Sequence, residues 1–301
     1  MVRRALGFKL QSAGSRLEKF VSFMEGQEEP FITTQLAVSW AQRNAGILPS
    51  GWAANLTDIR LFAQYCSGID SRTEVPSHSI LPYRTQRKEP HIYTSEEVAR
   101  LLEAASRLAP RSGLLPRTYT TLFGLLATTG LRVGEALGLH RDAVDLGRGV
   151  LEVRFTKFNK TRLVPVHRST LEALHDYARQ RDRLHPTPRS PWFFVSPRGG
   201  PLYARPLRQT FIQLSRQIGL RGETDRHGPR LHDFRHSFAV HTLLAWYQAG
   251  QDVERKLPLL STYLGHTHPS DTYWYLSATP ELLAAATLRL ENSSGGSNAC
   301  E

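Results

Sequence analysis

Residues 231–246 read LHDFRHSFAVHTLLAW, and from His232 onward the pattern is helical. His232 and Arg235 are three residues apart, so they share one face of a helix. His232 and His236 are four apart, a spacing that zinc sites also use. A zinc protease would have Glu directly after the first histidine, whereas Asp233 stands here and Arg235 would bring a cation beside the metal. A zinc site is therefore disfavoured. Two interpretations stay open for this stretch: a core histidine with a salt-bridged surface arginine, or a functional pair.

Three further stretches lie on either side of this one. Residues 129–138, TGLRVGEALG, place Arg132 just after a helix-breaking glycine, with Glu135 three residues later on the same helical face. Residues 156–162, TKFNKTR, form the predicted tip of a β-hairpin. The triplet LGH at 264–266 is followed nine residues later by Tyr275, within DTYWYL at 271–276. Each stretch is a weak signal by itself, and the ordered set is a strong one.

In this order, the stretches resemble the tyrosine recombinase (phage-integrase-type) family over residues ~90–290, which covers the whole second domain predicted below. The resemblance implies an enzyme that cuts and rejoins DNA through a 3′-phosphotyrosine intermediate. It also implies roles for single residues. Arg132 and Arg235 would clamp the scissile phosphate, and Glu135 would orient Arg132. His232 and His266 would bind the phosphate and manage protons. Lys157 would protonate the 5′-oxygen, and Tyr275 would be the nucleophile. Phe158 departs from the family pattern, which often has glycine after the lysine, and Trp274 makes the nucleophile segment unusually aromatic.

Two of these assignments have competitors nearby. Tyr263 and Tyr273 lie close to Tyr275 in the chain, and Tyr273 cannot share a helical face with Tyr275 because the two are two residues apart. The family spacing from His266 selects Tyr275. Lys160 competes with Lys157 for the general-acid role, and the family's placement of its lysine favours Lys157.

Elementary chemistry supports the same roles. A phosphodiester is an anion, so attack by a second anion requires that its charge be neutralised, which two guanidiniums can do with planar paired donors. A tyrosine hydroxyl has an ordinary pKa of about 10, so a cationic cluster must favour the phenolate. A covalent phosphotyrosine stores the bond energy, so rejoining needs no ATP. The sequence has neither a phosphate-binding Gly-rich loop ending in Lys-Ser/Thr nor an evident carboxylate cluster, so we expect no metal and no cofactor.

The predicted fold is mostly α with a small β-sheet or hairpin (α+β). The pattern predicts an N-terminal helical domain over residues 1–88, with a basic linker at about 71–90, then a second domain over 89–291 and a disordered tail over 292–301. The resemblance implies that the first is a core-binding domain and the second the catalytic domain. Residues 94–97, TSEE, form a capping box that opens a helix. A hairpin is predicted over 150–166, a helix capped by Ser169, a short strand over 192–196, and helical structure from 232 to 290.

The charge of the chain indicates a polyanionic partner. The formal net charge is +11, and residues 148–235 alone contain 18 basic and 7 acidic side chains. We therefore expect double-stranded DNA as the partner. The family acts as a homotetramer that exchanges C-terminal helices, and the apolar segment 280–290 would suit that exchange, although packing against its own chain explains it equally well. Phosphate contacts are expected from six basic residues: Arg84, Arg87, Lys88, Arg205, Arg208 and Arg216.

Composition excludes other classes. Two cysteines, Cys66 and Cys300, rule out a disulfide framework, and no apolar run approaches the ~18 residues of a membrane helix. The expectation is thus a cytoplasmic, nucleoid-associated enzyme, with the short N-terminus favouring a transposon or plasmid over a phage. Two alternatives remain: a type IB topoisomerase that relaxes supercoils as a monomer, and a catalytically inactive sequence-specific DNA-binding protein.

Overall fold

The computed structural model divides the chain into two compact units, Met1–Lys88 and Glu89–Glu301. It describes residues 10–43, 46, 48–81, 89–110, 113–154, 161–225, 227–268, 270–277, 280–284 and 287. None of the helices within these residues is both long enough and apolar enough to span a bilayer.

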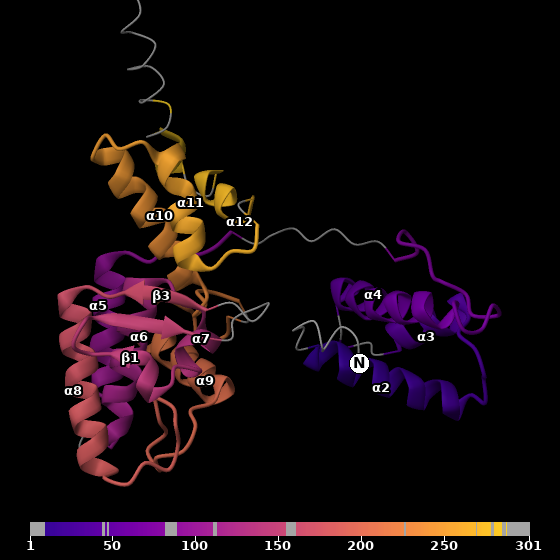
Figure 1. Cartoon of the computed structure of the whole chain (residues 1–301), viewed down its shortest axis with the longest axis horizontal. Coiled ribbons are helices and arrows are strands. Elements are labelled where there is room, and N and C mark those ends of the chain that lie inside the picture. Colours follow the sequence, from indigo (N-terminus) through magenta and orange to yellow (C-terminus); the bar gives the residue numbers. More distant parts are fainter. Residues whose placement is uncertain are drawn as a thin grey trace, which may run out of the picture. The chain divides into compact units, whose positions relative to one another are not determined.

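The first unit is a helical bundle (Figure 1). Its helices are α2 (Gln11–Gly26), α3 (Thr34–Gln42) and α4 (Pro49–Cys66). Thr33 caps α3 by accepting a hydrogen bond from the amide of Leu36. The buried side chains of this unit, among them Phe20, Trp40 and Ile59, make a core of its own.

Residues 71–81, predicted as the start of the linker, pack against the first unit. Buried Arg60 donates hydrogen bonds to the carbonyl oxygens of Pro76 (2.8 Å) and Ser77 (3.1 Å), and Leu81 is buried in the core. An arginine that binds main-chain carbonyls holds a segment that has no helix or strand of its own. Composition alone did not indicate this anchoring.

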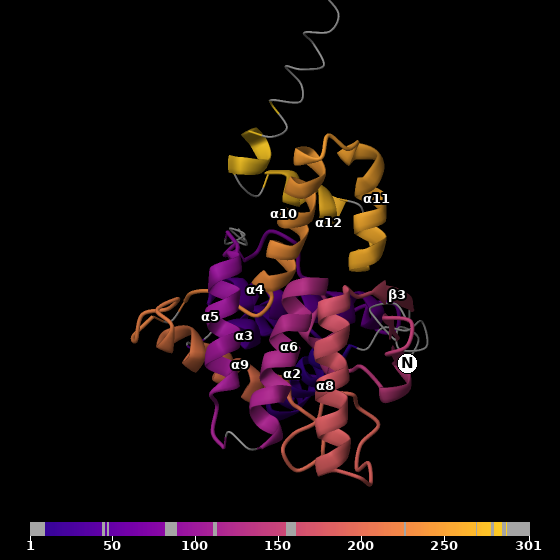
Figure 2. The same ribbon diagram turned by 90° about the vertical axis from the view of Figure 1, so that its left-hand side faces the viewer.

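The second unit is built around helix α6. Figures 1 and 2 show α5, α6 and α8 side by side, and α6 contacts both of the other two. Aromatic side chains such as Tyr119, Phe123 and Phe211 belong to the buried core of this unit. The helices here are α5 (Ser95–Ser106), α6 (Leu114–Thr129), α7 (Val133–Leu137), α8 (Arg168–Leu184) and α9 (Ala204–Gln217).

The predicted hairpin is present as part of a small sheet. Strands β1 (Val144–Asp145), β2 (Val150–Val153) and β3 (Arg162–Pro165) pair in that order and antiparallel within the described residues, with Val153 opposite Arg162. The sheet confirms the mostly helical fold with a small sheet, and β1 is an addition that the sequence pattern did not indicate because it has two residues.

Several local predictions are confirmed and two are wrong. The capping box opens α5, with Thr94 and Glu97 each binding the other's amide. Helix α8 is capped by His167 rather than Ser169, because the imidazole of His167 accepts from the Ser169 amide. Residues 192–196 are not a strand: Trp192 bridges His140 and Val195 bridges Pro201, so no ladder continues along the segment.

The C-terminal helical stretch is divided into separate elements. They are α10 (Asp233–Gln248), α11 (Val253–Leu264), α12 (Ser270–Tyr273) and the 3₁₀ turn η2 (Trp274–Ser277). Gly250 and Gly265, both at positive φ, interrupt the predicted continuous pattern. Leu282 is buried against its own chain in the cluster that also contains Tyr275.

Candidate active site

The turn between α6 and α7 presents Arg132. Helix α6 ends where Gly130 adopts a left-handed conformation (φ +61°), and Leu131 after it is buried. A Cβ atom on Gly130 would lie 2.7 Å from the ring of Phe238 on α10, so only glycine lets the turn approach α10 this closely. Arg132 follows in extended conformation directly before α7. The turn therefore holds Arg132 beside the helix that carries Arg235.

Glu135, on α7, is shared by two arginines. Its Oε1 accepts from Nη1 of Arg132 (2.8 Å) and Nη1 of Arg162 (3.1 Å), and its Oε2 accepts from Nη2 of Arg162 (2.7 Å) and the amide of Arg132 (3.0 Å). Burial alone would raise the pKa of Glu135, but the hydrogen bonds and charges of Arg162 and Arg132 outweigh it and lower the pKa to about 2. The carboxylate therefore stays ionised and holds both guanidiniums.

Arg235 is buried in the first turn of α10, with 2% of its surface exposed. Its Nη1 donates to the carbonyl of Gly130 (2.9 Å) and its Nη2 to that of Leu264 (2.6 Å). Burial and then the neighbouring charge of Arg132 lower the pKa of Arg235 to about 10, so it remains protonated at neutral pH. Among the described residues no carboxylate forms an ion pair with it. A buried cation held only by neutral carbonyls gains from binding an anion.

Three consecutive carbonyl groups at the end of α11 each accept a hydrogen bond from a different arginine. Arg162 Nε donates to Tyr263 (2.8 Å), Arg235 Nη2 to Leu264 (2.6 Å) and Arg132 Nη2 to Gly265 (3.1 Å). The last carbonyls of a helix have no partner within the helix and carry partial negative charge. This carbonyl row, the main-chain oxygens of residues 263–265, thus aligns guanidiniums that come from β3, α10 and the start of α7.

The turn after α11 places His266. Gly265 is left-handed (φ +67°), and the amide of His266 donates back to the carbonyl of Ser261 (3.0 Å), as in a Schellman motif. The His266 Nδ1 lies 2.6 Å from Oγ1 of buried Thr272. Burial, followed by the charges of Arg235 and Arg132, lowers the pKa of His266 to about 4. His266 is therefore neutral at pH 7.

Tyr275 lies inside this group of side chains, in η2. It is 3% exposed, and its ring is nearly parallel to that of His266 at a centroid distance of 6.0 Å. The ring of His236 is 5.5 Å away on another side. Tyr273, the competing tyrosine, is 55% exposed. The structure brings Tyr275 and not Tyr273 to the histidines.

His232 directly precedes α10 and is accessible at the surface. Its pKa is lowered by partial burial and then by the charge of Arg235. Its ring meets that of His236 edge to face at 4.9 Å. Among the described residues, no three His, Cys, Asp or Glu side chains gather as a metal site requires, so the disfavoured zinc alternative gains no support.

The remaining predicted residues fall into two sets. Lys157, its competitor Lys160, and the linker residues Arg84, Arg87 and Lys88 fall outside the described residues. Arg205, Arg208 and Arg216 are exposed on α9. They do not belong to the arginine cluster, which consists of Arg132, Arg162 and Arg235.

Arg162, the last residue of TKFNKTR, is part of this site, although the sequence pattern assigns it no role. One feature of the sequence points to it: a charged residue, Arg162, begins a strand that continues with the apolar residues Leu163 and Val164. Its side chain is 10% exposed, which the alternation of a half-buried hairpin does not reveal.

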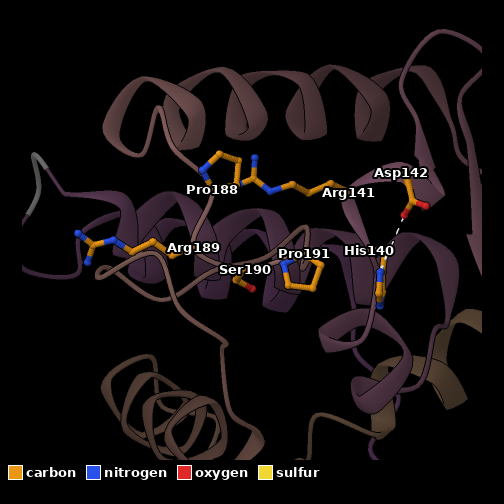
Figure 3. Close-up of a pocket in the computed structure, with 7 residues that line it drawn as sticks. All are labelled: His140, Arg141, Asp142, Pro188, Arg189, Ser190 and Pro191. Atoms are coloured by element: carbon orange, nitrogen blue, oxygen red, sulfur yellow. Dashed lines mark ion pairs between the residues drawn. The ribbon is translucent and has the colours of Figure 1, made fainter.

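A separate cavity of about 540 Å³ lies between residues 140–142 and 188–191 (Figure 3). Arg141 and Arg189 contribute to its wall, and in Figure 3 their side chains do not converge on one point. Arg141 pairs with Asp182 (2.8 Å), and none of the lining residues is a predicted site residue.

Gly265→Ala should destabilise the second unit. A Cβ at this position would lie 2.7 Å from Nη1 of Arg162, and the left-handed backbone adds strain. We expect a loss of about 2–4 kcal/mol in the free energy of unfolding, measured by urea denaturation. Gly250→Ala is the matched control, because φ is +65° there and nothing lies within 4 Å. It should lose only about 1–2 kcal/mol. Equal losses in the two variants would contradict the close approach of Arg162.

His266 should make the stability of the protein depend on pH. Its pKa is about 4 in the folded chain and about 6.5 when unfolded, so between these values the unfolded state binds more protons. The free energy of unfolding should therefore fall as the pH falls from 6.5 to 4. His266→Gln should remove on the order of 1–2 kcal/mol of that fall, in urea titrations at each pH. An equal fall in the wild type and in His266→Gln would contradict this assignment.

Comparison with known proteins agrees with this geometry. The family model described as "Phage integrase family" matches residues 92–281. The chain is similar to y4rB of Sinorhizobium fredii (strain NBRC 101917 / NGR234), by name an integrase/recombinase, with 49% identity over 96% of this chain and 94% of y4rB. It is also similar to the tyrosine recombinase XerD of Caulobacter vibrioides (strain ATCC 19089 / CIP 103742 / CB 15), with 30% identity over 79% of this chain and 74% of XerD.

A solved structure shares the fold. The Tn1549 transposon integrase, in complex with transposon right end DNA, matches with a TM-score of 0.66 and 15% identity over 94% of this chain and 93% of that one. At this identity the likeness concerns the fold alone. Together with the family match over most of the second unit, these relatives lead to one conclusion: the chain belongs to the phage integrase family of tyrosine recombinases.

Proposed function

We propose that this protein is a site-specific DNA recombinase that cuts and rejoins double-stranded DNA through a 3′-phosphotyrosine intermediate. The observation that carries the proposal is the grouping of Arg132, Arg235 and Tyr275 around the end of α11. Within the described residues this group has more guanidiniums than carboxylates, and buried Arg235 has only neutral partners. Such a positively charged group binds an anion such as a phosphate, and Tyr275 lies beside it in a place to attack the bound phosphate.

In the proposed cleavage step, the Tyr275 oxygen attacks the phosphorus and the bond to the 5′-oxygen breaks. Arg132 and Arg235 bind the non-bridging oxygens, and the hydrogen bonds described above leave further N–H donors on each guanidinium for this contact. Neutral His266 and accessible His232 hydrogen-bond the phosphate, and an imidazole of this pair accepts the proton that leaves Tyr275. Lys157 protonates the departing 5′-oxygen.

Rejoining reverses these bonds. A 5′-hydroxyl from the partner strand attacks the phosphotyrosine, and Tyr275 leaves as the phenolate and regains its proton. The number of phosphodiester bonds is unchanged, so no external energy source is required. The arginines serve both directions because the charge that develops at the phosphate is the same.

DNA binding and assembly form the second part of the proposal. The first unit would bind the core site, and Arg84, Arg87, Lys88, Arg205, Arg208 and Arg216 would contact phosphates. Relatives of this fold have been solved with DNA, among them XerH bound to difH substrate. We infer a homotetramer in the synaptic complex and a place of action on the nucleoid in the cytoplasm, in the service of a mobile element.

The test is capture of the covalent adduct. The full chain is incubated in EDTA with a library of nicked duplexes that carry random sequence, and SDS-resistant complexes are recovered and sequenced. We expect adducts that converge on one duplex sequence over successive rounds. A chain that binds DNA but never forms an adduct would be the inactive alternative. Adducts at unrelated sequences, with relaxation of plasmid by the monomer, would identify the topoisomerase alternative.

A further inference from the structure

Arg162 connects the hairpin to the arginine cluster. It is the first residue of β3 and the last residue of the stretch 156–162 that contains Lys157, and it pairs with Val153 across the sheet. From there its guanidinium donates to both oxygens of Glu135 and, through Nε, to the carbonyl of Tyr263. One nearly buried side chain therefore contacts α7 and the end of α11 at once.

The contacts of Arg162 limit how many hydrogen bonds the Glu135 carboxylate can accept from Arg132. A carboxylate has about four lone-pair positions, and Glu135 accepts four hydrogen bonds, two of them from Arg162. The Arg132 side chain consequently obtains one bond to Glu135, through Nη1, while its Nη2 binds the carbonyl of Gly265. Without Arg162, Arg132 would be free to form the stronger bidentate pair with Glu135 and to leave Gly265.

The guanidinium of Arg162 packs closely against Gly265 at the end of α11. Gly265 has no side chain, and any Cβ there would lie within 3.3 Å of three guanidinium atoms of Arg162. Arg162 thus fills the space beside the turn from which His266 and the Gly265 carbonyl emerge. The strand, the α7 turn and the α11 turn are held in one relative placement.

We propose that Arg162 is a positioning residue of the active site. By donating two of the four hydrogen bonds that Glu135 accepts, it keeps Arg132 in its phosphate-binding orientation. This inference rests on the proposed function. Arg162 itself does not touch the phosphate. Its loss should slow the chemical step and leave DNA binding nearly unchanged.

The first experiment uses the full chain and the duplex recovered by covalent capture. Arg162→Gln should lower the single-turnover rate of adduct formation about 10- to 100-fold, with the DNA concentration at half-saturation within about threefold of the wild type. Arg162→Lys should recover part of the rate, because an ammonium can pair with Glu135 but cannot donate to both carboxylate oxygens and Tyr263 in the same geometry. Should Arg162→Gln fail to fold, Arg162→Lys carries the test.

The control and the double variant separate positioning from general stability. Arg154→Gln removes an arginine at the end of β2 that also pairs with two carboxylates, Asp142 and Glu152, and it should keep the wild-type rate. The variant that combines Glu135→Gln with Arg162→Gln should be no slower than Glu135→Gln alone, because Arg162 acts through Glu135. The inference would be overturned if the rate losses of Glu135→Gln and Arg162→Gln multiplied in the double variant, or if Arg162→Gln kept the wild-type rate.

A second measurement does not depend on activity. In the ¹⁵N-arginine NMR spectrum of the full chain, Arg132 should show two separate Nη signals, because Glu135 and Gly265 hold both groups and slow their rotation. In Arg162→Gln that pair of signals should move or merge. An unchanged Arg132 spectrum would overturn the inference even if the wild type forms no adduct, and the absence of the adduct itself would overturn only the proposed function.

Discussion

Replacing Tyr275 by phenylalanine is expected to abolish the covalent adduct, with a fall in rate on the order of 10³-fold or more. The substitution removes the attacking oxygen and preserves the ring that packs beside His266 and His236. DNA binding should stay close to that of the wild type. The adduct is measured on denaturing gels with the duplex recovered by covalent capture, and binding by titration of the same duplex.

Tyr273→Phe is the matched control for this prediction. The two tyrosines are two residues apart, yet Tyr273 is 55% exposed and Tyr275 is 3% exposed. Tyr273→Phe should therefore form the adduct at the wild-type rate. An adduct that persists in Tyr275→Phe and disappears in Tyr273→Phe would reverse the assignment of the nucleophile.

Arg235→Ala is expected to lower the rate of adduct formation by about 10²- to 10³-fold. The substitution removes a charged donor at the position where charge develops on the phosphate, and it leaves the carbonyls of Gly130 and Leu264 without their arginine partner. Single-turnover kinetics at saturating DNA isolate this loss from any loss of binding. Arg235→Lys should remain at least about 10-fold slow, because one ammonium cannot reach both carbonyls and a phosphate oxygen.

The stability of Arg235→Ala provides an additional check. Burial lowers the pKa of Arg235 because the folded chain supplies no carboxylate partner for it among the described residues. Removing this charge should therefore cost less stability than removing a paired buried charge, about 1–2 kcal/mol for the lost hydrogen bonds. A loss above about 4 kcal/mol, equal to that of a broken buried ion pair, would contradict the interpretation of Arg235 as a cation that awaits an anion.

Local signals in the sequence predicted most of the fold. The Thr94 capping box and the glycine that ends α6 act over a few residues, so they can be read without tertiary information. The site also depended on spacing, and the i, i+3 relation of Arg132 and Glu135 is present as an ion pair. The choice of Tyr275 over Tyr273 as nucleophile came from the family spacing and stays a prediction.

Contacts between distant residues could not be predicted in the same way. Arg162 meets Glu135 across 27 residues and Tyr263 across 101, and no local pattern encodes such distances. The cap of α8 was misplaced because His167 performs a role that serine usually has. Residues 71–81 looked like a linker because their anchor, Arg60, lies in a preceding helix.

The carbonyl row has a consequence for insertions and deletions. Three arginines from separate elements bind three successive main-chain oxygens, so one residue added or removed near position 260 would shift the register of all three together. The loop at 249–252, between α10 and α11, lies outside the carbonyl row, and Gly250 has open space around it. Among natural variants of this chain, length changes should accumulate in that loop and be absent from the last turn of α11.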